Sequence, residues 1–168
     1  MPTQINGLPA HVLLIHAVVI LVPVAALVLV GQAWSQRVRR WAGALGPLLC
    51  LGALVLVPIT TSTGEWLRDH LNPQLAASEP VRKHADLGGQ LLPWVIAMFV
   101  LSVAVWYLGR RTPEGDETVV LPSAGGAVAV QVVVAVLATV AAVGAVVQTA
   151  RIGDSGAQAV WKGTVVTR

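Results

Sequence analysis

The chain has 168 residues, of which 55% are hydrophobic and only 11% are charged, and its mean hydropathy is +0.74. A soluble domain has about 25% charged residues, so a soluble core of this length could not bury so much apolar surface. The formal net charge of +3 does not indicate nucleic-acid binding, because the sequence has no basic stripe with interleaved aromatic residues.

Four uncharged stretches are long enough to cross a bilayer, whose hydrocarbon core of about 30 Å requires roughly 20 helical residues. Helices are expected because they satisfy their own backbone in lipid, whereas transmembrane strands would be shorter and alternate in polarity. The spans are predicted at about 11–32, 41–63, 87–109 and 122–150, with a tail at 151–168. The sequence therefore predicts an all-α integral membrane four-helix bundle, formed by a single domain over 1–168.

The charged residues between the spans predict the orientation of the chain. Arg37, Arg39 and Arg40 follow the first span without an acidic residue, and no charged side chain precedes that span. Because cytoplasmic loops carry an excess of Lys and Arg, this loop is expected in the cytoplasm. Both termini and the loop 64–86 are then expected on the outer, non-cytoplasmic side.

Several polar residues within the spans are expected to have structural roles. The hydroxyls of the run 60–63 can bond back to carbonyls of their own helix. Gln131 and Gln148 are expected to form hydrogen bonds between helices. Cys50, the only cysteine, lies within an apolar run and is expected to be a small core residue.

The residues that could bind a ligand gather at the outer end of the predicted bundle. All four histidines fall in the outer half or the outer loop, and each helix contributes at least one candidate at this end. Helical bundles commonly build metal and cofactor sites from facing side chains in this way. The candidate metal ligands are His11, His16, Glu65, His84 and Asp154. His70 lies beside Arg68 and Asp69 and is expected in a solvated loop.

His11 and His16 are five residues apart, which is about 140° around a helix, so they are poorly placed to chelate one ion together. His16 lies deeper in the hydrocarbon, where an ionisable side chain normally faces the bundle. His16 is therefore the sharper candidate, and His11 could be an interfacial residue. The structural alternative is that these histidines are packing residues with hydrogen-bond partners and that the carboxylates are solvated.

The chain resembles a bacterial, actinobacterial-type family of small four-span membrane proteins defined only by a domain of unknown function. The resemblance rests on Gly7-Leu8-Pro9-Ala10-His11 with the following His16, on Thr63-Gly64 with Asp69, on His84, and on the segment 151–157, Arg-Ile-Gly-Asp-Ser-Gly-Ala. Family members typically have a His at the position of Asp154. The resemblance implies a multi-pass protein of the bacterial plasma membrane with a polar outer site. Some relatives are joined to iron-sulfur domains, which implies membrane electron transfer.

Two functions are compatible with these features. His16 and His84 could be axial ligands of haem b, or the candidate residues could hold a single transition-metal ion, in either case for electron transfer. Alternatively, the chain is a non-catalytic accessory subunit of a larger, respiratory-type membrane complex, or a homo-oligomer. The sequence has no nucleophile and base at a recognisable spacing and no phosphate-binding glycine loop, so an enzyme is less expected.

Overall fold

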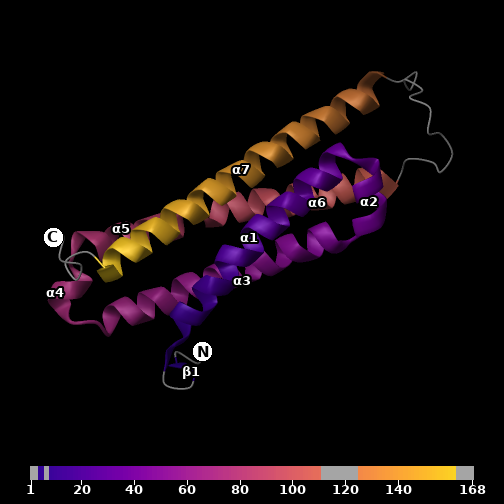
Figure 1. Cartoon of the computed structure of the whole chain (residues 1–168). Coiled ribbons are helices and arrows are strands. Elements are labelled where there is room, and N and C mark those ends of the chain that lie inside the picture. The colour runs from indigo at the N-terminus through magenta and orange to yellow at the C-terminus, as the bar shows by residue number, and fades with distance from the viewer. Residues whose placement is uncertain (1–3, 6–7, 111–124, 162–168) are drawn as a thin grey trace, which may run out of the picture.

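The computed structural model describes residues 4–5, 8–110 and 125–161, and these are predominantly helical (Figure 1). Two short strands, β1 (Gln4–Ile5) and β2 (Leu8–Pro9), pair antiparallel just before the first helix. The helices are α1 (Ala10–Trp34), α2 (Gln36–Ala42), α3 (Leu45–Asp69), α4 (Pro73–Ala76), α5 (Glu79–Gly89), α6 (Leu92–Arg110) and α7 (Gly125–Trp161).

Within this described part of the chain, four helical segments are long and apolar enough to span a membrane. They are Ala10–Trp34, Leu45–Asp69, Glu79–Arg110 and Val128–Trp161. The prediction of an all-α, multi-pass membrane fold is confirmed at this level. The long helices run side by side, with α2 at one end of the bundle and α4 and α5 at the other (Figure 1).

The interior of the bundle is rich in alanine and valine, and many large apolar side chains lie on the outside. Helix α1 packs against both α3 and α7, and its buried face includes Val22, Ala25 and Leu29, all of which are fully inaccessible. On the opposite face, Ile20 and Leu27 are 66% and 74% exposed. Large apolar side chains on the outside are expected of helices in contact with lipid, and small interior residues let helix backbones approach closely.

Helix α3 continues past the predicted end of the second span at 63 to Asp69, and the elements differ from the predicted spans in three further places. The first loop forms its own helix, α2, capped by Ser35, whose hydroxyl accepts a hydrogen bond from Val38 N at 3.3 Å. Gly43 ends α2 with a φ of 50°, a conformation that favours glycine. The third segment is interrupted between α5 and α6, where Gln90 N donates to Leu87 O.

The third difference is the length of α7, which continues through the predicted tail to Trp161. Residues 151–161 are therefore helical and extend the last span. The tail was predicted because Arg151 and Asp154 interrupt the apolar run, but a helix can continue beyond the hydrocarbon core once its polar side chains reach water.

The predicted roles of the polar residues within the spans are confirmed. Each hydroxyl of the run 60–63 donates to a carbonyl of α3 three or four residues earlier. Gln148 Nε2 donates to Leu87 O at 2.9 Å and so joins α7 to α5. With its amide oxygen facing α2, Gln131 accepts a hydrogen bond from Arg39 Nη1 at 2.8 Å. Cys50 is fully buried.

Candidate metal site at one end of the bundle

His11 lies in the first turn of α1 and faces α3. Its Nδ1 donates a hydrogen bond to the backbone carbonyl of Thr60 at 3.0 Å. The ring also packs against Gly64, where an added Cβ atom would lie 2.8 Å from His11 Cε1. The carbonyl of Thr60 and the missing side chain of Gly64 therefore fix both the position and the orientation of this imidazole.

His84 lies on α5 and faces α7 in a similar way. Its Nδ1 lies 3.1 Å from both the Ile152 carbonyl and the Ser155 hydroxyl, and that hydroxyl itself donates to Ile152 O at 2.9 Å. A Cβ atom on Gly156 would lie 3.1 Å from His84 Cε1. Positions 152, 155 and 156 are three and four residues apart, so they share one face of α7.

The two imidazoles meet at the end of the bundle opposite α2, which we call the histidine end. Their ring centroids are 6.1 Å apart and their planes are inclined by 80°. A carbonyl oxygen can only accept a hydrogen bond, so Nδ1 carries a proton in both rings. In a neutral imidazole, Nε2 then has the free lone pair with which histidine binds metals.

His16 does not face the bundle, contrary to the expectation that it is the better ligand. The residue is exposed, and its Nδ1 donates to Val12 O of the same helix at 2.6 Å. The expectation was based on the predicted depth of His16 in the membrane. Which side chain points inward depends instead on how α1 is rotated about its axis. His16 shares the exposed face of α1 with Ile20, four residues further along.

The two candidate carboxylates are exposed and do not form a group of potential metal ligands with the histidine pair. Glu65 is exposed on α3, and Asp154 is exposed on α7, where it accepts a hydrogen bond from Gln158 Nε2 at 2.8 Å. Within the described ranges, no group of three or more His, Cys, Asp or Glu side chains could hold a metal ion. The five predicted residues therefore do not form one site, and the structure brings together only His11 and His84 among them.

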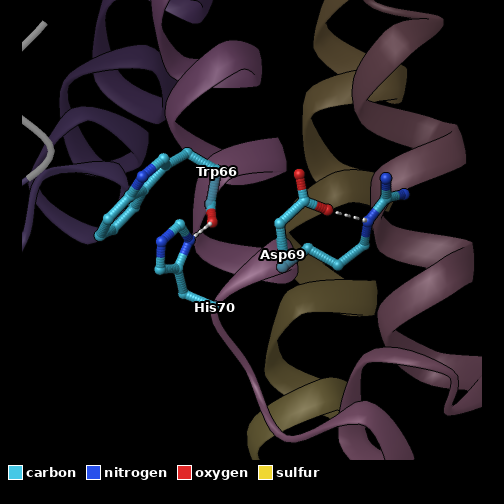
Figure 2. A network of polar contacts seen from close by, with 4 residues as sticks. Trp66, Asp69 and His70 are labelled. Atoms are coloured by element: carbon cyan, nitrogen blue, oxygen red, sulfur yellow. Dashed lines mark hydrogen bonds and ion pairs between the residues drawn. The ribbon is translucent and has the colours of Figure 1, made fainter.

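His70 lies at the exposed end of α3, as expected of a residue in contact with solvent. Its ring stacks on Trp66 with centroids 4.1 Å apart, and its Nδ1 donates to the Trp66 carbonyl at 2.8 Å (Figure 2). The neighbouring Asp69 lies 3.9 Å from the guanidinium of Arg68, and both side chains are largely exposed. These contacts cap the helix and give no sign of a ligand site.

The sequence contains a signal that distinguishes the two histidines of α1. Positions seven residues apart lie on nearly the same face of a helix. Counting from His11 leads to Val18, Ala25 and Gln32, which are all buried. Leu27 and Trp34, which are exposed, follow His16 by about three and five full turns of the helix and therefore share its face. The register of small and polar residues thus indicates His11 as the inward histidine.

Ser155 is the partner that the sequence analysis missed. Attention to ionisable groups favoured Asp154, whereas the side chain that contacts His84 is the adjacent hydroxyl. No protein-family model, curated protein or solved structure matches this chain. Functional inference therefore rests on the residues themselves.

Proposed function

We propose that the protein binds one transition-metal ion between His11 and His84 and uses it for electron transfer at the membrane surface. The observation that carries this proposal is the pair of imidazoles, each of which donates from Nδ1 to a backbone carbonyl and leaves Nε2 for a ligand. Metal-bound histidines in proteins usually have this arrangement, because a hydrogen bond at one nitrogen fixes the tautomer and the ring orientation.

The separation of the rings supports a shared ion. A histidine nitrogen lies about 2 Å from its metal, so two imidazoles on opposite sides of one ion have centroids roughly 6 Å apart. The observed centroid distance is 6.1 Å. The distance between the two rings therefore matches that expected for two imidazoles bound to one ion.

The nature of the ligands favours copper. Two neutral nitrogen ligands without a carboxylate suit a soft or borderline ion better than magnesium, calcium or manganese. The close packing of each imidazole against a glycine favours an ion over haem, because a macrocycle needs a wide flat cavity. Copper alternates between its +1 and +2 states and would supply one-electron chemistry.

We further propose that the protein lies in a bacterial plasma membrane with the histidine end outside. The support is the position of Arg37, Arg39 and Arg40 at the α2 end, together with the bias of cytoplasmic loops towards Lys and Arg. In intact cells, a membrane-impermeant maleimide should label a cysteine introduced at position 70 but not one introduced at position 41, each in a Cys50→Ser background. The reverse labelling would overturn this orientation.

The metal site is tested with the full-length protein purified in mild detergent and loaded with Cu(I) under anaerobic conditions. Elemental analysis after desalting should give about one copper per chain. Oxidation by ferricyanide should then produce the electron paramagnetic resonance spectrum of Cu(II) with nitrogen hyperfine splitting. His11→Ala and His84→Ala should each weaken copper binding by 100-fold or more.

His16→Ala is the matched control, because it removes an exposed imidazole from the same helix as His11. Copper content and affinity in this variant should equal those of the wild type. A similar loss in His16→Ala, or copper below half an equivalent in the wild type, would contradict the proposal. A Soret band in the purified wild type that is lost in His11→Ala and His84→Ala would identify haem in place of copper.

A further inference from the structure

The α2 end of the bundle concentrates basic residues. Arg37, Arg39 and Arg40 lie on α2, and Arg110 ends α6. Helix α2 contacts α6, and the Arg39 side chain passes directly over Gly109. Four guanidinium groups from two helices therefore lie at one end of the molecule, where the spans meet the membrane surface.

Two of these arginines form contacts with other groups of the protein. Arg39 donates from Nε to Gln32 O at 2.9 Å and from Nη2 to Ala33 O at 3.1 Å, and so caps α1. The guanidinium of Arg110 lies 4.4 Å above the Trp106 ring in a cation–π contact. These contacts are intramolecular and explain why both side chains are held in place.

Arg37 and Arg40 have a different environment. They are three residues apart, so they share one face of α2, and both are exposed. Neither guanidinium has a hydrogen-bond or ion-pair partner among the residues that the structure describes. The next residue, Trp41, is 82% exposed, and Trp34 at the end of α1 is 57% exposed. Exposed tryptophans are typical of the level of lipid headgroups.

We propose that Arg37 and Arg40 form a binding site for the headgroup of an anionic phospholipid. The guanidinium fork matches the geometry of phosphate oxygens, and Arg is well suited to this bidentate contact. Basic residues at the ends of membrane helices are attracted to anionic lipids. The site is independent of the histidine pair and stands whether or not that pair binds a metal.

The apolar surface beside the arginines favours a lipid over a free phosphate ion. Leu45 and Leu48, which follow Trp41 at the start of α3, are 39% and 62% exposed. A phospholipid bound by the two arginines could lay its acyl chain along this surface. Inorganic phosphate has no apolar part and would gain nothing from it.

The proposal is tested by native mass spectrometry of the full-length protein in detergent with added phosphatidylglycerol or phosphatidylcholine. The wild type should retain phosphatidylglycerol in preference. An arginine near an anionic surface strengthens binding by roughly fivefold. The double variant R37Q/R40Q should therefore bind phosphatidylglycerol about 25-fold more weakly, with circular dichroism unchanged.

R82Q/K83Q is the matched control, because it removes two exposed charges from α5 at the opposite end. This variant should keep the preference for phosphatidylglycerol. An equal loss in R82Q/K83Q would show a general charge effect and overturn the site. No preference in the wild type, or displacement of the lipid by millimolar inorganic phosphate, would also overturn it.

Discussion

The two ends of the bundle use polar side chains in opposite ways. At the α2 end, Arg39 bonds through three nitrogens to carbonyl groups of α1 and to Gln131 of α7, so its bonding capacity holds helices together. At the histidine end, His11 and His84 each use Nδ1 for a similar purpose, and their Nε2 atoms have no hydrogen-bond partner among the described residues. The comparison teaches that the bonds of Arg39 are committed to holding helices together, whereas each of the two imidazoles is held through one nitrogen only.

The largest expected effect is on stability at the α2 end. Arg39→Leu removes charged hydrogen bonds, each worth about 1.5–3 kcal/mol, and because such terms are not additive the free energy of unfolding should fall by about 3 kcal/mol. Arg40→Leu, an exposed neighbour on the same helix, should change it by less than about 0.5 kcal/mol. Unfolding by SDS in mixed micelles without anionic lipid would measure both, and equal losses would contradict the structural role of Arg39.

An intermediate effect is expected where His84 packs on α7. Gly156→Ala would push the imidazole away and should weaken copper binding about tenfold, equivalent to about 1.4 kcal/mol. A Cβ on Gly153 meets no atom within 4 Å, so Gly153→Ala should leave affinity unchanged. It should also raise stability by up to about 1 kcal/mol through helix propensity. Competition with a chromogenic copper chelator would measure the affinities, and a pair of equal values would refute the packing argument.

The smallest expected effect concerns the attachment of α5 to α7. Gln148 is buried and donates to Leu87 O, whereas Gln158 is exposed on the same helix and bonds to Asp154. Gln148→Leu should lower the free energy of unfolding by about 0.6 kcal/mol, the average for hydrogen bonds between membrane helices. Gln158→Leu should have no measurable effect. If the two variants unfold alike, the bond between the helices does not contribute to stability.

The sequence was sufficient to predict the helical membrane fold because long apolar runs without charge have few alternative structures. It also predicted the bonding of the hydroxyls at 60–63 and of Gln148, since such polar groups in lipid need partners nearby. Helix α2 and the interruption near Gln90 were missed, because hydropathy has no information on local capping and turns. Orientation relative to the two faces of the membrane stays a prediction.

The candidate site was predicted less well, because it depends on how the helices rotate about their axes. The depth of His16 in the predicted span indicated that this residue is the ligand. In the structure, however, the packing of α1 turns His16 to the outside and His11 to the inside. His84 was among the candidates, yet its partner is Ser155 and not Asp154. To predict a site composed of residues from separate helices, one must know how those helices are aligned and rotated against each other. The depth of a single residue in its span does not give this information.

The break between α5 and α6 separates His84 from the membrane-spanning part of its own segment. The histidine is attached to α7 by Ser155 and by the bond from Gln148 to Leu87, while His11 belongs to the continuous helix α1. An ion shared by the two rings would add a direct link between α1 and α5. Capture of the ion would then tighten the closure of this end of the bundle, and its release would let α5 move independently of α1.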